Sequence, residues 1–374
     1  MYLKVVISSL FLIVSISIQA QKKDTSQLKI SAYVDSYMSS FSNDLNQQTF
    51  QPYTTAGARD NTFGVNVAQI GLHYTGNSIR GNFIYHDGDI PQATWSNNFN
   101  NLQEANAGFK LLDGLWLDMG FFATHIGTES FLPKENMLGQ TSFITYNEPF
   151  YQAGAKLSYG AKNHWNFELW VANGYNRHVD NNDAKSVGVQ VKKEFSKNTC
   201  ITYSNMFGRE SDDSSAVDQY RFYNNIYLNH NWKDKIYLTA GFDLGTQTNT
   251  DLSNADKTAL MYAGLLTVRY QFTPKYSVTA RGEFSEDENG FINGLYQTGF
   301  VGFSLIPVYE GISLYGITLG GEYKPNDNSY VRLDGRYLAT GNNQNIFIEN
   351  GSVTNERLEI MITIGFFIDK AFKI

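Results

Sequence analysis

Hydrophobic and polar residues alternate along several segments of this chain, and the clearest case runs from residue 260 to residue 285. One set of positions holds Leu260, Tyr262, Gly264, Leu266, Val268, Tyr270 and Phe272, and after Pro274 it continues as Tyr276, Val278, Ala280, Gly282 and Phe284. The intervening positions turn polar, with Arg269 near the end of the first run and Arg281 and Glu283 in the second. A period of two predicts two β-strands, each with one apolar and one polar face.

Strand-like runs of this kind recur from Leu28 to Ile368, and the segments that join them are alternately short and long. Short connections are expected at 76–78, 113–114, 161–163, 196–198, 233–234, 273–275 and 325–328. Long connections are expected at 40–61, 90–101, 128–149, 175–183, 210–218, 248–256, 287–311 and 341–356. Tight turns at one end and long loops at the other are typical of membrane β-barrels, and the runs add up to about sixteen strands. The run 298–309 contains Pro307 and is assigned to the long loop 287–311, although it could instead extend the next strand.

The alternation by itself also suits a soluble β-sandwich, whose apolar faces point inward. Three features favour a transmembrane barrel: the apolar faces are long, no helices are predicted that could cover them, and charges of both signs lie in mid-strand on the polar face. Aromatic residues also gather beside the short turns, as in an interfacial girdle. The predicted girdle comprises Tyr74, Phe109, Trp116, Tyr159, Trp165, Phe195, Trp232, Tyr237, Phe272, Tyr276, Tyr323 and Tyr330.

Composition supports strands and excludes helical spans. Aromatic residues make up 15% of the chain, whereas only 7 of 374 residues are proline, and this combination fits pleated sheets. After the N-terminal region, no apolar run approaches the roughly 18 residues of a transmembrane helix. A net charge of −7 without a basic cluster gives no reason to expect a nucleic-acid partner.

The first twenty residues have the pattern of a secretory signal peptide. Lys4 precedes an apolar run from Val5 to Ile18, and the small residue Ala20 comes before a polar stretch. We therefore expect a signal peptide at 1–20, a short N-terminal segment at 21–27 and a single all-β, up-and-down antiparallel barrel domain at 28–374. An uncleaved anchor helix is the alternative. The single cysteine, Cys200, cannot form an internal disulfide.

The stretch 320–341, GGEYKPNDNSYVRLDGRYLATG, resembles the C-terminal hairpin of OmpL-like β-barrel porins, which are outer-membrane proteins of Gram-negative bacteria. The matching elements are Glu322-Tyr323-Lys324-Pro325 with its short turn and the run from Arg332 to Tyr337. Asp334 stands where glutamate is more usual, and the chain ends in AFKI rather than in the phenylalanine common to such barrels. The resemblance implies a porin in the outer membrane and identifies no solute.

Eight charged residues on the polar faces of the last five strands are the predicted pore-lining set. They are Arg269, Arg281, Glu283, Glu322, Arg332, Asp334, Arg336 and Glu359. As one wall of an up-and-down barrel they could create a transverse field that orients solutes. The alternative is that they pair across strands and only solvate the inner wall. The long loops 128–149 and 287–311 are expected to form the constriction.

No pattern predicts catalysis, a cofactor or a metal site. The six histidines are scattered, and no zinc motif, nucleophile elbow or phosphate-binding loop occurs. Acidic clusters at 210–218 and 286–288 could bind divalent cations, but solvated loops are the favoured explanation, because charge runs usually lie in solvent.

The sequence thus predicts an outer-membrane porin that passes small hydrophilic solutes through a water-filled lumen. The alternatives are a plugged barrel whose loops act in adhesion and an outer-membrane hydrolase with dispersed residues. Expected partners are outer-membrane lipid, lipopolysaccharide, the solutes and the barrel-assembly machinery during insertion. A homo-oligomer is compatible with the sequence.

Overall fold

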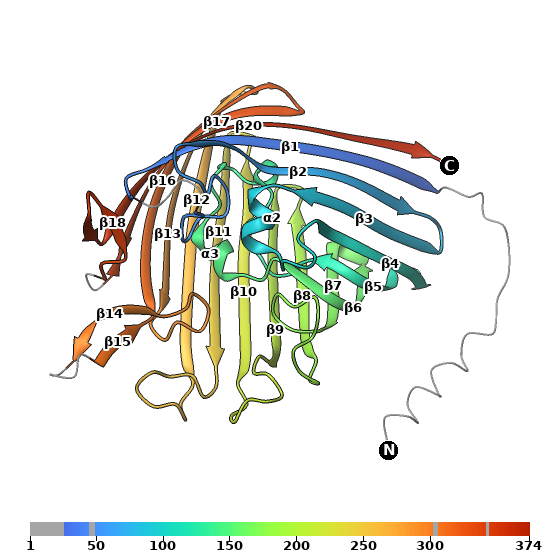
Figure 1. Ribbon diagram of the computed structural model, residues 1–374. Coiled ribbons are helices and arrows are strands. Elements are labelled where there is room, and N and C mark those ends of the chain that lie inside the picture. The colour runs from blue at the N-terminus through green and yellow to red at the C-terminus, as the bar shows by residue number, and fades with distance from the viewer. Residues whose placement is uncertain (1–25, 45–48, 302–305, 342–343) are drawn as a thin grey trace, which may run out of the picture.

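The computed structural model describes residues 26–44, 49–301, 306–341 and 344–374, and sixteen of its strands form a closed antiparallel barrel (Figure 1). Every strand pairs with its neighbour along the chain, and the last strand pairs with the first. The sixteen are β1 (Gln27–Phe41), β2 (Thr62–Thr75), β3 (Ile79–Asp87), β4 (Leu102–Leu112), β5 (Leu115–Ala123), β6 (Tyr151–Ala161), β7 (Trp165–Ala172), β8 (Ser186–Ser196), β9 (Thr199–Arg209), β10 (Tyr220–Trp232), β11 (Ile236–Gln247), β12 (Ala259–Thr273), β13 (Tyr276–Asp287), β16 (Ile312–Asn326), β17 (Ser329–Thr340) and β20 (Glu356–Lys373). The predicted fold class and strand number are confirmed.

Smaller elements lie in the long connections. They are α2 (Asp89–Thr94), α3 (Phe143–Asn147), the short 3-10 helix Pro133–Glu135, and two separate two-stranded sheets, β14 (Tyr296–Val301) with β15 (Ile306–Glu310) and β18 (Phe347–Glu349) with β19 (Ser352–Thr354). A further 3-10 turn, Lys162–His164, joins β6 to β7. Among the described helices, none is long and apolar enough to cross a membrane. The predicted signal peptide lies outside the described residues.

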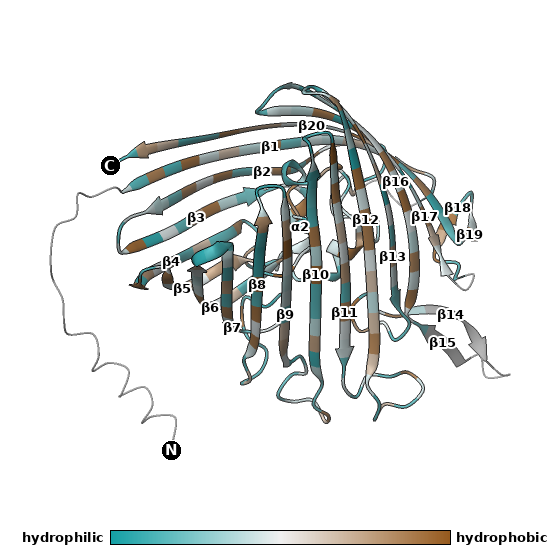
Figure 2. Ribbon diagram, turned by 180° about the vertical axis from the view of Figure 1, so that it is seen from behind, coloured by the Kyte–Doolittle hydropathy of each residue, from teal (hydrophilic) through white to brown (hydrophobic). Residues whose placement is uncertain are grey.

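The outer face of the barrel is apolar, as the alternation predicts. In β12, Leu260 and Leu266 are about half exposed, whereas Met261 and Ala263 are fully buried. Figure 2 shows apolar and polar residues alternating along β8 to β12. Exposed leucine, isoleucine and phenylalanine side chains continue around the wall from β1 to β20. A surface of this kind is stable where hydrocarbon replaces water.

Three members of the predicted aromatic girdle point inward, so the girdle prediction was wrong for Trp116, Tyr237 and Tyr330. The Arg80 guanidinium lies over the Trp116 ring, Tyr237 lines an internal cavity, and Tyr330 is buried. Each lies an even number of positions from polar inward residues of its own strand, so the alternation of side chains places it inside the barrel. The exposed members include Phe109, Phe195, Trp232, Phe272 and Tyr276.

Long connections fold into the barrel and pack against its inner face. Figure 1 shows α2 and α3 within the ring of strands. Loop and strand side chains form three apolar clusters there, which include Trp95 and Phe131, Ile126 and Tyr223, and Tyr53 and Phe143. The lumen is therefore partly packed.

Candidate functional site

The loop 124–150, which joins β5 to β6, crosses the inside of the barrel and divides it into two unlike regions. On one side the loop is fixed to the charged wall of β12, β13, β16, β17 and β20. On the other side it borders a cavity. Of the two loops expected to form a constriction, this one lies in the lumen. In the other, Phe291 and Ile292 pack against the interior cluster, but the hairpin β14–β15 projects away from the barrel (Figures 1 and 2).

The structure brings the eight predicted charged residues together on this wall. Inward parity and cross-strand register account for the grouping, since Arg269 lies opposite Thr279, Glu322 opposite Arg332, and Arg336 opposite Glu359. Arg269 is half-buried and the other seven are buried.

The wall residues pair with one another, as the alternative interpretation of their charges expects. Arg332 Nε lies 2.7 Å from Glu322 Oε2, and Arg269 Nη1 lies 3.3 Å from Glu322 Oε1. Arg336 Nη2 lies 2.6 Å from Glu359 Oε2, and Arg281 Nη2 lies 3.3 Å from Glu283 Oε1. Buried charges of both signs thus neutralise each other locally.

The same residues also hold the loop, chiefly through its backbone. Arg332 donates to the carbonyl oxygens of Pro133 at 2.6 Å, Asn136 at 3.0 Å and Leu138 at 3.1 Å. Asp334 Oδ2 accepts the backbone N–H groups of Gly139 at 2.6 Å and Gln140 at 2.9 Å. Guanidinium groups suit this task because each offers five donors in a fixed plane.

The remaining wall contacts extend along the loop toward α3. Arg281 Nη1 donates to the Gln140 carbonyl at 2.9 Å and pairs with Glu129 at 3.2 Å. Glu283 accepts the Phe143 N–H at 2.8 Å, and Arg336 donates to the Thr141 carbonyl at 3.1 Å. Seven of the eight residues contact the loop directly; these are Arg269, Arg281, Glu283, Arg332, Asp334, Arg336 and Glu359.

Sequence reasoning missed two partners of this wall, Arg357 and Glu129, and the buried carboxyl group of Glu148, which lies toward β10 and β11. Arg357 is fully buried, pairs with Glu359 at 2.6 Å and donates to the Pro52 carbonyl at 2.8 Å in the first long loop. Its parity with Glu359 would have placed it inward. Glu129 and Glu148 lie in the loop 124–150, where no local pattern indicates which side chains turn toward the wall.

Two inward glycines, Gly320 of β16 and Gly241 of β11, let the loop lie close to the inner face of the barrel. A Cβ atom on Gly320 would lie 2.4 Å from Leu138 Cδ2, and one on Gly241 would lie 2.3 Å from Thr128 Oγ1. Any larger side chain at these two positions would push the loop inward. The wall is thus shaped for a loop that lies directly on it.

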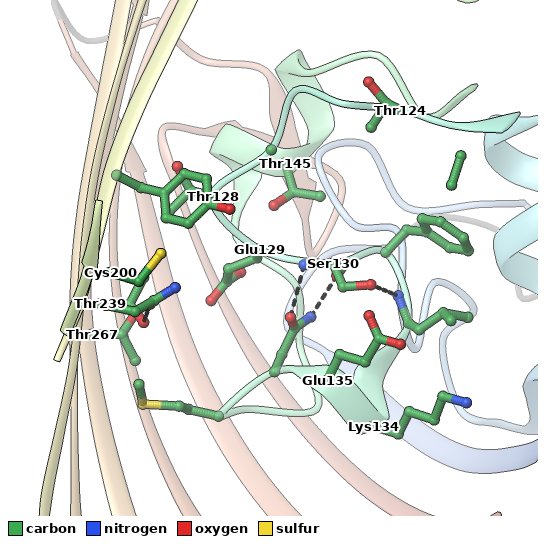
Figure 3. Close-up of a pocket in the computed structure, with 18 of the residues that line it drawn as sticks. Thr124, Thr128, Glu129, Ser130, Lys134, Glu135, Thr145, Cys200, Thr239 and Thr267 are labelled. Atoms are coloured by element: carbon green, nitrogen blue, oxygen red, sulfur yellow. Dashed lines mark hydrogen bonds between the residues drawn. The ribbon is translucent and has the colours of Figure 1, made fainter. Parts of the chain in front are cut away.

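The cavity occupies about 1210 Å³ between the loop and the inner faces of the strands. It reaches the short-turn end, because its lining includes Ser196, Asn198, Asn231 and Lys324 near the tight turns. Figure 3 shows Thr128, Glu129, Ser130 and Thr145 of the loop on one side and Thr239 and Thr267 of the wall on the other. Hydroxyl groups and charges predominate among these residues, so the cavity is suited to water and polar solutes.

Charges of both signs line the cavity in equal number. The six cationic residues are Lys29, Lys134, Lys197, Arg269, Lys324 and Arg332, and the six acidic ones are Glu104, Glu129, Glu135, Glu148, Glu194 and Asp369. His125 adds no charge at neutral pH, because burial lowers its pKa to about 4. Of the eight predicted pore-lining residues, Arg269 and Arg332 are among those that line the cavity. The role of the set in selectivity stays a prediction.

No metal site is found among the described residues: no group of three or more His, Cys, Asp or Glu side chains is arranged to hold an ion. Three acidic residues of the loop 210–218 form ion pairs: Arg209 pairs with Asp213 and Asp218, and Arg221 pairs with Glu210. This loop therefore has a structural explanation for its charge.

A closed barrel of sixteen strands, apolar outside and polar within, with one long loop laid across its lumen, defines the class of outer-membrane porins. Residues 27–368 match the family model "Putative beta-barrel porin-2, OmpL-like", and the chain belongs to that family. It is an outer-membrane protein, and both family and fold indicate a channel rather than an enzyme.

Solved structures of porins and channels share the fold at low sequence identity. The anion-selective porin from Comamonas acidovorans aligns with a TM-score of 0.61 at 9% identity, covering 92% of this chain and 100% of that one. The outer membrane channel DcaP of Acinetobacter baumannii aligns at 0.59 and 9% identity, covering 94% and 100%. Salmonella typhi OmpF, in complex with daunomycin, aligns at 0.56 and 14% identity, covering 92% and 97%. Among curated proteins, the comparison finds no significant match.

Proposed function

We propose that small hydrophilic solutes pass through this porin by way of the cavity beside the loop 124–150, and that this loop sets the size limit. The observation that carries the proposal is the cavity itself: about 1210 Å³ of space with a polar lining, inside a wall whose outer face is apolar. Water in such a bore is stabilised by hydroxyl and charged groups, while lipid holds the wall in place.

Conductance of the purified protein in planar bilayers tests this route. Thr267 lines the cavity, and its neighbour Leu266 points outward. Thr267→Trp should lower the conductance because the indole occupies the bore, whereas the matched variant Leu266→Trp should conduct as the wild type does. Equal conductance in both variants would show that the current takes another route.

Passage should follow the size of the solute more than its charge, because the cavity carries equal numbers of cations and acids. Swelling of liposomes that contain the protein, measured over graded sugars, amino acids and small anions, should show a size cutoff and only weak charge preference. Strong exclusion of either charge sign at equal size would contradict the proposed balance.

We further propose that Arg269 and Arg332, the two members of the predicted set that reach the cavity, orient charged solutes. Arg269→Gln removes one cavity charge, and Glu322 keeps its closer partner, Arg332. The expected result is a small shift of the reversal potential toward cations. If the reversal potential of Arg269→Gln does not change, the charged wall has only a structural role and does not orient solutes.

A plugged barrel is the second candidate, and a specific observation favours it. Three apolar clusters lie inside the barrel, and such packing can close a bore. A barrel of this kind would present its loops for adhesion. Discrete conductance steps distinguish a channel from a plugged barrel, which gives none.

The route to the membrane is also a proposal. A signal peptide at 1–20 would be cleaved on export, leaving the short segment 21–27 before the barrel domain 28–374. The barrel-assembly machinery would then insert the chain among phospholipid and lipopolysaccharide, as a monomer or as a homo-oligomer. N-terminal sequencing of the mature protein tests the cleavage, and cross-linking in native membranes tests the assembly state.

A further inference from the structure

The two ends of the barrel carry charge of opposite sign. Because consecutive strands are antiparallel, the long connections share one end of the barrel and the short ones share the other; Figure 1 shows the loops after β9 and β11 at the same end. The long connections outside the luminal loop 124–150 contain fourteen acidic and four basic residues; they are 42–61, 88–101, 173–185, 210–219, 248–258, 288–311 and 341–355. The short connections contain five lysines and three aspartates; they are 76–78, 113–114, 162–164, 197–198, 233–235, 274–275 and 327–328.

The lysines of the short connections are exposed, and within the part of the chain that the structure describes none of them belongs to an ion pair. They are Lys162, Lys197, Lys233, Lys235 and Lys275. Lysines that do form pairs lie elsewhere, as in the pairs of Lys29 with Asp369 and of Lys110 with Asp113. Lys197 also lines the cavity, as does Lys324 near another short turn. The uncompensated positive charge therefore surrounds the opening of the cavity at the short-turn end.

The geometry of the turn between β10 and β11 does not by itself favour a lysine. Lys233 and Asp234 have φ angles of 55° and 53°, and the two central residues of such a turn are most often Asn, Asp or Gly. Lysine is among the less suitable residues for the first of these positions. Its presence there is explained better by its charge than by the local backbone.

The long-loop end keeps negative charge after its ion pairs are taken into account. Arg209 and Arg221 at the ends of β9 and β10 pair with three acidic residues of the connection 210–219. Four exposed carboxylates from four different connections form no ion pair among the described residues; these are Asp183, Asp212, Asp256 and Glu288. The acidic surface thus extends over several neighbouring loops.

We propose that this opposition of charge makes the channel rectify, so that more current flows when the long-loop side is positive than when it is negative. A fixed charge at an opening attracts mobile ions of the opposite sign and repels those of its own sign. The long-loop opening therefore collects cations, and the short-turn opening collects anions.

The polarity follows from which ions enter at which opening. With the long-loop side positive, cations enter through the acidic opening and anions through the basic one, so both kinds accumulate in the bore. With the voltage reversed, each kind must enter through the opening that repels it, and the bore is depleted of ions. The inference rests on the proposed function, because a current must pass, and it requires no net preference for either sign, which agrees with the equal numbers of charges in the cavity.

Current–voltage curves of the mature protein in planar bilayers test the inference. The side that faces each compartment is assigned in a Cys200→Ser background with Ser214→Cys, an exposed position of the connection 210–219, from the compartment in which a bulky maleimide reagent alters the current. At about 10 mM KCl, where the screening length is about 30 Å, the current at one polarity should exceed that at the other by about twofold. At about 1 M KCl, where this length is about 3 Å, the two currents should be equal.

Neutralising either end should bring the ratio of the two currents toward one at low salt. At the short-turn end the variant combines Lys197→Gln, Lys233→Gln, Lys235→Gln and Lys275→Gln, and its matched control replaces the same four lysines by arginine, which keeps the charge and should keep the ratio. At the long-loop end the variant combines Asp183→Asn, Asp212→Asn, Asp256→Asn and Glu288→Gln. Both variants are expected to conduct at 1 M KCl as the wild type does.

The inference is overturned if the wild type conducts symmetrically at low salt, rectifies with the opposite polarity, or rectifies as strongly at 1 M KCl, since the shape of the bore would then be the cause. It is also overturned if the glutamine variant and the arginine control give the same ratio. If a variant fails to fold, the wild type at the two salt concentrations decides. A protein that conducts without rectifying refutes this inference alone, whereas one that never conducts refutes the proposed route and this inference with it.

Discussion

The two sides of the loop 124–150 face the same barrel interior but meet opposite conditions. Toward β12 to β20 its backbone carbonyls are matched by arginines, and the charges there are paired. Toward β8 to β11 it borders a cavity lined by hydroxyl and charged groups, and there Glu148 accepts from Thr128 and Asn225. The difference teaches that one side fixes the loop in place, whereas the other side is left for water and solutes.

Removing a central arginine of the fixed side should have the largest effect. Arg281→Ala deprives both Glu129 and Glu283 of the arginine that pairs with them. Breaking a buried pair in this way should lower the free energy of unfolding by about 3–5 kcal/mol. The measurement is urea unfolding in lipid vesicles, and freeing the loop should also make the single-channel current larger or noisier. Arg281→Lys keeps the charge and should lower the free energy of unfolding less than Arg281→Ala does. If Arg281→Ala unfolds and conducts as the wild type does, the wall does not hold the loop.

A pair of adjacent glycines tests the close approach of loop and wall with a smaller expected effect. A Cβ on Gly320 would meet Leu138 and Asp334, whereas one on Gly321 meets nothing within 4 Å. Gly320→Val should destabilise the protein by about 1–3 kcal/mol through overpacking. Gly321→Val, on the outer face of the same strand, is the control and should unfold within about 0.5 kcal/mol of the wild type. Equal losses in both variants would argue for a general cost of valine in β16.

Changing a charge on the open side should have the smallest effect on stability and act mainly on permeation. Glu135 is exposed and lines the cavity. Glu135→Lys should move the reversal potential toward anions, with Glu135→Gln giving a shift in the same direction and of roughly half the size, because the field depends on the net charge of the lining. Unfolding midpoints should not change. An unchanged reversal potential would show that permeating ions do not pass this part of the loop.

The wall could be predicted from the sequence because each strand obeys a period of two. Leu266 and Arg281 were assigned to opposite faces by parity alone, and the structure agrees. Trp116 and Tyr330 were assigned to the outer girdle by residue type and position, and for these two parity would have been the better guide. The alternation of apolar and polar residues indicates which face of a strand meets lipid and which meets the barrel interior. This rule holds wherever the strand is regular.

The site could be predicted only in part, because its contacts join distant segments through the backbone. Arg332 lies about two hundred positions from the Pro133 carbonyl that it contacts. Because every residue has a backbone carbonyl, the sequence does not indicate which one an arginine will contact. Glu148 belongs to a loop without periodicity, so nothing local indicated its burial beside Asp243. Charged residues on the wall were therefore found, while their partners in the loop were not.

The pairing of the first and last strands has a consequence for the order of assembly. All fifteen residues of β1 lie opposite β20, from Gln27 with Lys373 to Phe41 with Glu359. This seam joins the first and the last strand of the barrel, so it cannot form until β20 has been synthesised. Until then the sheet has two edge strands with unpaired backbone N–H and C=O groups. These groups are unfavourable in the hydrocarbon region of a membrane, and they can pair with strands of other chains. Every earlier stage of assembly must therefore protect these unpaired edges, and the pairing of β20 with β1 removes them.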